Sequence, residues 1–188
     1  MSTKKILIVV DMQVDFIDGA LGSNEAATIV SPVCQKIETA RQNGDILIFT
    51  RDTHHEDYLD TEEGKHLPVP HCLKDSAGWQ IDKRLPIAED DTIIDKPTFG
   101  SLAFGNLLQQ KYSSTVESIE SIEFIGLCTD ICVLSNAVIA KAALPDVPIV
   151  VDAACCAGVT PESHDTALAA MKTIQVNVLH QGQEPWRK

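Results

Sequence analysis

Two cysteines stand four residues apart in the stretch FIGLCTDICVLSNAV, residues 124–138, where an apolar run ends and a helical pattern begins. Cys128 and Cys132 could act as metal ligands, as a redox pair, as buried core or as a nucleophile. A structural zinc site needs two further ligands close by, and a CxxxC pair that opens a helix is not a usual zinc-binding spacing. By residue type, such a cysteine is more often core than catalytic. The chemistry still favours a nucleophile at Cys132, because unpaired N–H groups at a helix N-terminus lower the pKa of a thiol and can bind an oxyanion.

Asp11 and Lys96 would complete the groups that a thiol nucleophile requires. Asp11 follows the apolar run ILIVV, and Lys96 follows TIID. Asp11 could take the thiol proton as a general base, and Lys96 could stabilise the negative charges around it. Taken singly, Asp11 is typical of a strand cap, and Lys96, just before Pro97, of a solvated surface lysine. Their joint placement at strand ends favours the catalytic interpretation.

Short apolar runs alternate with helical segments along the chain. The runs are rich in Ile and Val, which predicts strands buried on both faces of a parallel sheet, at 5–11, 45–52, 91–96, 122–127, 147–153 and 174–179. Helical spacing occupies 25–43, 100–112, 129–143 and 161–173, with Gly44 ending the first helix and Thr160 and Pro161 opening the last. The pattern predicts a three-layer, Rossmann-like α/β fold with a six-stranded, mostly parallel sheet and helices on both faces. The carboxyl ends of such strands meet at one rim, which would bring Asp11, Lys96 and Cys132 together.

Composition limits the classes of partner. Lys and Arg total 15 against 27 Asp and Glu, and the net charge of −12 would repel a phosphate backbone, so we expect no nucleic acid. No apolar segment approaches the roughly 18 residues of a membrane-spanning helix, and the N-terminus lacks a signal-peptide pattern. We therefore expect a cytoplasmic protein without a membrane partner. Six cysteines, unevenly spaced and without a CxxC, are expected to be reduced thiols.

The segment 53–90 separates the second and third expected strands and carries four of the six histidines. Connections this long are uncommon in compact domains and are usually functional or disordered. A functional interpretation would place an imidazole-rich site beside the strand ends. The plain alternative is a solvated loop rich in acids and histidines.

Five stretches in the same order give a specific resemblance. VVDMQVDF (9–16), TRDTH (50–54), LPVPHC (67–72), DKPTFGSL (95–102) and GLCTDICV (126–133) resemble the isochorismatase-like cysteine hydrolases, and among them the nicotinamidase/pyrazinamidase branch. The resemblance covers residue 5 to about 180 and implies a single isochorismatase-like hydrolase domain over 1–188. TPESHDTAL (160–168) is similar to the opening of the family's last helix, where His164 would have a structural purpose.

The resemblance implies a catalytic triad of Asp11, Lys96 and Cys132. In the family, the cysteine attacks an amide carbonyl, a thioester forms with release of ammonia, and water hydrolyses the thioester. It also implies a cis peptide bond at Leu127–Cys128, with the backbone N–H groups of Cys128 and Cys132 lining the oxyanion hole. Cys128 would then contribute its backbone and not its thiol.

The family's metal-binding positions match Asp52, His54 and His71. The resemblance implies one divalent metal ion, with zinc expected first and iron or manganese as alternatives. Glu63 is expected as a fourth ligand, because it resembles a glutamate that some relatives use. Competitors for that position are His55, His66 and Glu62.

The substrate walls are expected at Phe16, Leu67 and Phe99. Nicotinamidases typically hold the substrate ring between two aromatic side chains. Phe16 matches the first of these, whereas the second position holds Pro68 beside Leu67. Phe99 falls where the family often has a tyrosine. By residue type alone, both phenylalanines could simply pack in the core.

Three hypotheses follow. The first is a nicotinamidase, which converts nicotinamide and water to nicotinate and ammonia and serves NAD salvage. The second keeps the triad for another small amide or carbamoyl substrate, and the third is a noncatalytic binding protein on the same fold. A redox role for the cysteine pair is a minor rival. Relatives suggest a homo-oligomer with a small-molecule substrate.

Overall fold

The strands form one parallel sheet at the centre of the molecule. The computed structural model describes residues 3–187, so that Met1, Ser2 and Lys188 of the predicted domain lie outside the described residues. Within that range, six strands pair in the order β3-β2-β1-β4-β5-β6, every neighbouring pair parallel. They are β1 (Lys4–Val10), β2 (Ile46–Asp52), β3 (Thr92–Lys96), β4 (Ile119–Leu127), β5 (Ile149–Ala157) and β6 (Asn177–Leu179). The predicted six-stranded α/β fold is confirmed.

Helices cover both faces of the sheet. One buried cluster joins Ile6 and Ile8 of β1 to α4 (Leu102–Tyr112), α5 (Leu134–Ala143) and α6 (Pro161–Thr173). A second cluster joins the alternate residues Leu7 and Val9 to α2 (Asn24–Asn43). Successive side chains of a strand point to opposite faces, so a continuous apolar run such as ILIVV is buried on both. Three layers result.

Local signals set the helix ends. The Ser23 side chain accepts a hydrogen bond from the Ala26 N–H at the start of α2, and Gly44 ends that helix in the left-handed conformation at φ 73°. Thr160 and Ser163 form a capping box at the start of α6, with Pro161 in its first turn. The predicted roles of Gly44, Thr160 and Pro161 are confirmed.

The helix predicted over 129–143 is present, but its first turn is not α-helical. Residues Thr129–Val133 form a π-helical turn, and α5 begins after it. The N–H groups of Ile131 and Val133 both bond to the Cys128 carbonyl, at 3.1 and 3.0 Å. A π turn is wider than an α turn and often occurs at functional sites. The nucleophile candidate Cys132 lies inside it.

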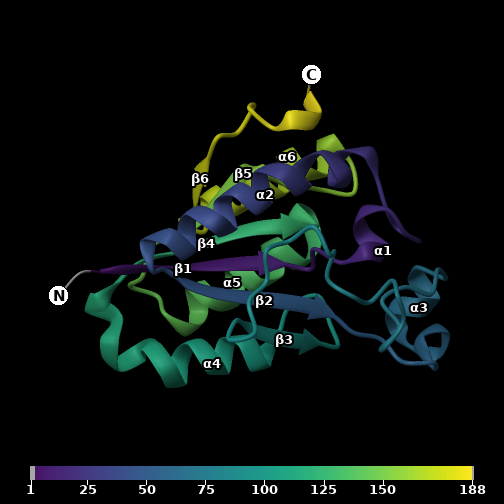
Figure 1. Cartoon of the computed structure of the whole chain (residues 1–188), viewed down its shortest axis with the longest axis horizontal. Helices are drawn as coiled ribbons and strands as arrows, with labels where there is room; N and C mark the ends of the chain where they lie inside the picture. The colour runs from purple at the N-terminus through teal and green to yellow at the C-terminus, as the bar shows by residue number, and fades with distance from the viewer. Residues whose placement is uncertain (1–2, 188) are drawn as a thin grey trace.

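The long segment after β2 folds against the carboxyl ends of the strands. It contains the 3-10 turn Tyr58–Asp60 and the short helix α3 (Glu62–His66). The buried Trp79 indole donates to the Thr53 hydroxyl at 2.8 Å, which fixes the returning chain. Figure 1 shows α3 and the short helix α1 (Val14–Ile17) beyond the arrowheads of the central strands.

The described helices also bear on the membrane question. Between residues 3 and 187, no helix combines the length and the apolar character needed to cross a bilayer.

Candidate active site and metal centre

Asp11 is fixed directly after β1. Its side chain is fully buried, and its backbone has φ 45°, a conformation that Asp adopts more readily than most residues. The Thr50 hydroxyl donates to Asp11 Oδ1 at 2.7 Å, and the Asp11 N–H donates to the Thr50 carbonyl at 3.2 Å. These bonds from β2 leave Asp11 Oδ2 facing Lys96 Nζ, 2.6 Å away.

Lys96, at the end of β3, lies at the centre of the site. Its ammonium group contacts Asp11 Oδ2, Asp52 Oδ1 at 2.9 Å and Cys132 Sγ at 3.4 Å, and it donates to the Thr98 carbonyl at 3.2 Å. The side chain is fully buried, which excludes the alternative of a solvated surface lysine. Burial alone would lower the pKa of Lys96, but Asp11, Cys132 and Asp52 outweigh it and raise that pKa well above its ordinary value. Lys96 is therefore a charged, fully paired ammonium.

Cys132 reaches the same point from the π-helical turn and is 5% exposed. Burial raises its pKa well above the ordinary value and the Asp11 carboxylate adds to this, while Lys96 acts in the opposite direction. We expected the helix N-terminus to lower the pKa of Cys132. That expectation is wrong, because burial and the Asp11 carboxylate raise this pKa. Burial also raises the pKa of Asp11, against the effect of Lys96. Burial thus disfavours the charged form of both groups.

The chain entering the turn has the geometry that the resemblance implies. The Leu127–Cys128 peptide bond is cis. Gly126 before it has φ 114°, and a Cβ there would lie 2.2 Å from the Val10 carbonyl oxygen, so the position requires glycine. Desolvation raises the pKa of the Cys128 thiol to about 12, with Asp130 and Asp11 adding to it. A thiol so hard to ionise suits a backbone role for Cys128 better than a redox role, and both cysteines are free.

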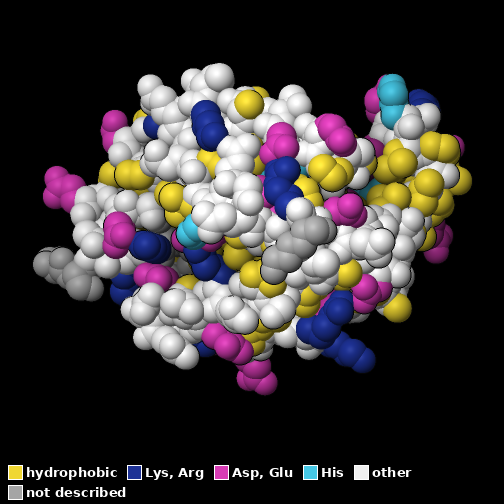
Figure 2. Space-filling view, turned by 90° about the horizontal axis from the view of Figure 1, so that it is seen from above, with side chains coloured by type: hydrophobic (Ala, Val, Ile, Leu, Met, Phe, Trp, Pro, Cys, Tyr) yellow, Lys and Arg dark blue, Asp and Glu magenta, His cyan; other side chains and the backbone are white. Residues whose placement is uncertain are grey.

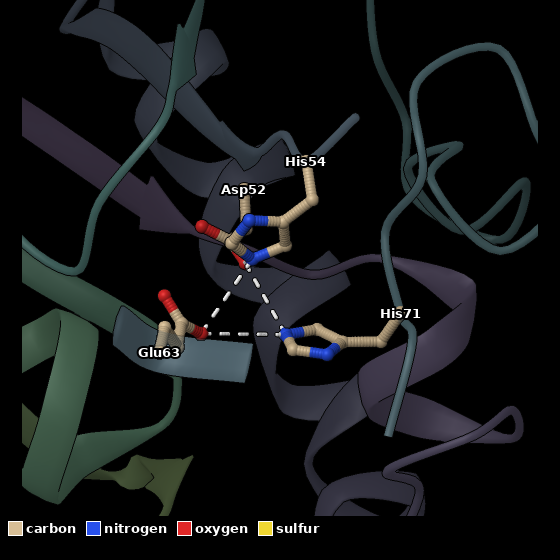
Figure 3. A group of neighbouring side chains, drawn as sticks. All are labelled: Asp52, His54, Glu63 and His71. Atoms are coloured by element: carbon tan, nitrogen blue, oxygen red, sulfur yellow. Dashed lines mark ion pairs between the residues drawn. The ribbon is translucent and has the colours of Figure 1, made fainter. Parts of the chain in front are cut away.

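Asp52, His54, Glu63 and His71 form a second cluster beside the triad (Figure 3). His54 Nε2 lies 2.9 Å from Asp52 Oδ2 and 3.5 Å from Glu63 Oε1. His71 Nε2 lies 3.6 Å from Asp52 Oδ2 and 3.7 Å from Glu63 Oε1. One ligand atom of each residue lies within 4.8 Å of the others. Asp52 ends β2, His54 follows it, Glu63 lies on α3, and His71 lies in the loop after α3.

The donor set fits a divalent metal ion. His71 Nδ1 donates to the Val69 carbonyl at 2.8 Å, which leaves its Nε2 lone pair free for a ligand. His54 Nε2 is buried and, although it lies 2.9 Å from Asp52 Oδ2, it makes no hydrogen bond there, an arrangement that a bound cation would satisfy. Two imidazoles and two carboxylates suit zinc, iron or manganese. The imidazoles and Lys96 hold the pKa of Asp52 well below its usual range, although burial acts against them.

The competitors for the fourth position lie outside this cluster. His55 is exposed, the side chains of Glu62 and His66 are 79% and 77% exposed, and His66 bonds back to the Glu62 carbonyl. Glu63 points inward from the same short helix. The geometry therefore selects Glu63 among the four candidates.

One carboxylate joins the two clusters. Asp52 Oδ1 pairs with Lys96, while its Oδ2 faces the imidazoles. Gln13 fixes the Asp52 backbone: its amide nitrogen donates to the Asp52 carbonyl at 2.8 Å, and its oxygen accepts from the Asp52 N–H at 2.6 Å. Sequence reasoning missed Gln13, although a glutamine directly after a buried strand, in DMQVDF, was a usable signal.

A cavity of about 360 Å³ is lined by residues of both clusters. Its lining includes Cys132 and the three predicted wall residues Phe16, Leu67 and Phe99, together with Asp52, Glu63 and His71. Phe99 and Leu67 are 43% and 37% exposed, so they flank an opening, and the core interpretation of Phe99 is wrong. The Phe16 ring stands edge-on to His71 at 5.5 Å. Figure 2 shows hydrophobic side chains gathered at the end of the molecule that carries α3.

Sequence reasoning also missed Asn136, which is fully buried on α5. Its amide donates to the Cys132 carbonyl at 2.8 Å and to the Phe99 carbonyl at 3.0 Å, and its oxygen accepts from the Ser101 N–H at 2.9 Å. Asn136 thereby ties the nucleophile turn to the loop that follows Lys96. A polar residue four positions after the candidate nucleophile, on the apolar face of a helix, was the available signal.

Comparison with known proteins adds a family match. Residues 5–183 match the family model of the Isochorismatase domain. The pyrazinamidase of Pyrococcus horikoshii in complex with zinc is similar at 25% identity and a TM-score of 0.79, over 94% of this chain and 98% of that one. A nicotinamidase/pyrazinamidase from Bacillus subtilis is similar at 30% identity and a TM-score of 0.80, over 95% and 100% of the two chains. N-carbamoylsarcosine amidase from Thermoplasma acidophilum is similar at 26% identity and a TM-score of 0.75, over 94% and 96%.

Proposed function

Because the chain belongs to the isochorismatase family, we propose that it is a metal-dependent nicotinamidase, which hydrolyses nicotinamide to nicotinate and ammonia. The observation that carries the proposal is the placement of two clusters around one cavity. The thiol of Cys132, which contacts Lys96 and through it Asp11, lines this cavity, and so do Asp52, Glu63 and His71 of the Asp-His-Glu-His cluster. Similarity to a nicotinamidase/pyrazinamidase and to a zinc-bound pyrazinamidase supports it.

In the proposed first step, Asp11 accepts the proton of the Cys132 thiol, and the sulfur attacks the amide carbonyl carbon. Lys96, 2.6 Å from Asp11 and 3.4 Å from the sulfur, stays close to whichever group carries the negative charge. The carbonyl oxygen becomes an oxyanion, which the N–H groups of Cys128 and Cys132 would stabilise. Collapse of the intermediate breaks the C–N bond, Asp11 returns its proton to the nitrogen, and ammonia leaves a thioester behind.

In the second step, Asp11 removes a proton from a water molecule, and the resulting hydroxide attacks the thioester carbonyl. The C–S bond breaks, the sulfur leaves as a thiolate beside Lys96, the proton returns from Asp11 to Cys132, and the released nicotinic acid loses its proton to solvent or to ammonia as nicotinate. The raised pKa of Asp11, which follows from burial, suits a group that must hold and release a proton in both steps.

Asp52, His54, Glu63 and His71 would hold the metal. A divalent ion bound there would supply a Lewis acid for the ring nitrogen of the substrate, directly or through water. Phe16 and Phe99 would contact the ring, and Leu67 would close the remaining wall. These contacts bind and orient the substrate, and the bond changes themselves occur at Cys132.

Ammonia release from nicotinamide tests the proposal. Metal-stripped protein should be inactive, and adding back zinc, iron or manganese in turn should identify the ion that restores turnover. Cys132→Ala should abolish ammonia release while the protein stays folded. Unchanged turnover in Cys132→Ala would rule out the mechanism, and a protein inactive with every amide and every ion would favour the noncatalytic alternative.

A second candidate is hydrolysis of another small amide or carbamoyl compound. It is favoured by the aliphatic wall at Leu67, where an aromatic would stack on a pyridine ring, and by the similarity to N-carbamoylsarcosine amidase. Relative kcat/KM values for nicotinamide and a panel of small amides decide between the two. We also propose a homo-oligomer, which light scattering would test.

A further inference from the structure

The C-terminal segment 182–187 reaches the π-helical turn Thr129–Val133, which carries the nucleophile, through one buried histidine. His164 of α6 is fully buried, with its Nδ1 2.8 Å from the Thr129 hydroxyl and its Nε2 3.1 Å from Glu184 Oε1. Thr129 is the first residue of the π-helical turn that carries Cys132. We propose that His164, oriented by Glu184, is a positioning residue for the nucleophile turn.

The hydrogen bonds define the state of the imidazole. Arg187 and the Gly182 N–H, the latter at 2.9 Å, both donate to Glu184 and keep the pKa of this carboxyl below its ordinary value, although burial opposes them. An ionised carboxylate accepts only, so the proton of the imidazole lies on Nε2. His164 Nδ1 must then accept, and the Thr129 hydroxyl must donate to it. The ionised Glu184 carboxylate therefore fixes the donor and the acceptor in both bonds: His164 donates to Glu184, and Thr129 donates to His164.

Further contacts hold the C-terminal segment in place. The Trp186 ring stands edge-on to His164 at 5.0 Å, and its indole N–H donates to the Cys156 carbonyl at 3.1 Å. Arg187 also pairs with Asp165 of α6. His164, Asp165 and Glu184 lie close enough to hold a metal ion, but the Arg187 guanidinium already pairs with both carboxylates. This cluster is therefore an anchor for the imidazole.

The turn depends on such external contacts. Thr129–Val133 has no side-chain hydrogen bond from its own N-cap residue, Cys128. Asn136, which also bonds the chain after β3, donates to the Cys132 carbonyl. On the opposite side, in the chain after β5, the Val159 N–H donates to Asp130 at 3.1 Å. The bond to His164 is the fully buried contact on that opposite side. Losing it should let the sulfur shift relative to Lys96, and a displacement of about 1 Å can cost about a hundredfold in rate.

Thr129→Val removes the donor and keeps the shape of the side chain. Resting on the proposed function, we expect kcat for nicotinamide to fall by about 10–100-fold. KM should change little, because neither Thr129 nor His164 lines the cavity or belongs to the cluster of Asp52, His54, Glu63 and His71. Thr129→Ser, which restores the hydroxyl, should recover most of the activity. Glu184→Gln keeps an acceptor oxygen but removes the charge that fixes the tautomer of His164, so it should also lower kcat. If Thr129→Val does not fold, Glu184→Gln provides the test in its place.

His180→Asn is the matched control. His180 also bonds a buried carboxylate, Asp152 Oδ1 at 2.9 Å, but it does not contact the turn, so its loss should leave kcat unchanged. A second readout is hydrogen exchange of the backbone amides in 128–133, which should accelerate in Thr129→Val and not in His180→Asn. A folded Thr129→Val with wild-type kcat, or with a change in KM alone, would overturn the proposal. If the wild type does not hydrolyse nicotinamide, the proposed function fails, while unchanged exchange in Thr129→Val would separately refute the positioning role.

Discussion

Replacing Glu63 with glutamine tests whether the fourth donor of the cluster holds the metal. With Asp52, Glu63 would supply two negative charges to a divalent ion, and the histidines would bind it as neutral imidazoles. Glutamine keeps the shape and one oxygen donor but removes one of those charges. We expect metal affinity to fall by about 10–100-fold, the range seen when groups that support a metal site are replaced.

The metal-free protein should respond in the opposite direction. Burial raises the pKa of Glu63, and the Asp52 carboxylate adds to this effect against the two imidazoles. The Glu63 charge is therefore unfavourable without the ion, and a neutral amide relieves it. We expect the metal-free Glu63→Gln protein to be as stable as the wild type or more stable.

Binding linkage converts the loss of affinity into a thermal shift. At a metal concentration 100 times Kd, the ion stabilises the fold by about 2.7 kcal/mol, and a hundredfold weaker Kd leaves about 0.4 kcal/mol. For a chain of this size, about 1 kcal/mol shifts Tm by about 2–4 °C, so the metal-induced rise should fall from about 5–11 °C to about 1–2 °C.

Calorimetry of metal-stripped protein, with and without added zinc, measures both effects, and competition with a chelator gives the affinity. Glu62→Gln is the matched control, because Glu62 is the neighbouring residue of the same helix and its side chain is 79% exposed. It should keep the full metal-induced rise. The reasoning is refuted if Glu63→Gln also keeps the full rise, or if its metal-free form unfolds at a clearly lower temperature than the wild type.

Three further substitutions test other parts of the site. Lys96→Met leaves the carboxylates of Asp11 and Asp52 buried without their cation, so the free energy of unfolding should fall by about 3–5 kcal/mol, as urea denaturation would show, and turnover should be lost. Cys128→Ser should keep kcat within about threefold in the ammonia assay, because Cys128 would act through its backbone N–H, which serine keeps; a large loss would implicate the thiol. Burial lowers the pKa of His164 below its ordinary value, so below about pH 6.5 the unfolded chain binds the proton more tightly and stability falls as the pH falls. Urea titrations at successive pH values should show that this part of the slope is missing in His164→Asn, and an unchanged slope would contradict the assignment.

The strands and the rim were predictable because buried parallel strands have a strong sequence signature. The runs that end at Asp11, Asp52 and Lys96 finish within one residue of the observed strand ends. Because the carboxyl ends of parallel strands converge, side chains far apart in sequence could be placed at one rim. Helix ends with caps, such as Gly44 and Thr160, were equally readable.

The environment of Lys96 was not predictable from its neighbours in sequence. A lysine before a proline looks solvated, and its burial depends on carboxylates that β1 and β2 supply from residues 11 and 52. Gln13 and Asn136 were missed for the same reason, since their partners are mostly backbone groups 35 or more residues away. The positions of such distant backbone partners cannot be read from the residues around Gln13 and Asn136 in the sequence.

The sequence predicts Glu63 as the fourth metal donor from the resemblance, but it keeps competitors such as Glu62, the neighbouring residue on the same short helix. Its rotation decides which one points inward. Thr61 caps α3 by accepting from the Gly64 N–H, and a Cβ on Gly64 would lie 2.0 Å from the Tyr58 carbonyl oxygen. Gly64 must therefore face the preceding turn, which directs Glu63 toward the cluster and leaves Glu62 exposed. A threonine cap followed three residues later by glycine carried this information.

The Cys132 pKa shows where local reasoning fails in this site. A helix N-terminus lowers the pKa of an exposed thiol, but this thiol is buried beside the Asp11 carboxylate, and both effects raise it. In the proposed mechanism, the proton moves from Cys132 to Asp11, so the net charge of the buried site does not change. Burial then penalises the anion on either side of the transfer, and its effect largely cancels. What remains is the position of the Lys96 charge, 2.6 Å from the carboxylate and 3.4 Å from the sulfur in the resting protein. A small movement of the turn toward Lys96 would favour the thiolate, which is why contacts that hold the turn, and not its local helix end, should govern the reactivity of the sulfur.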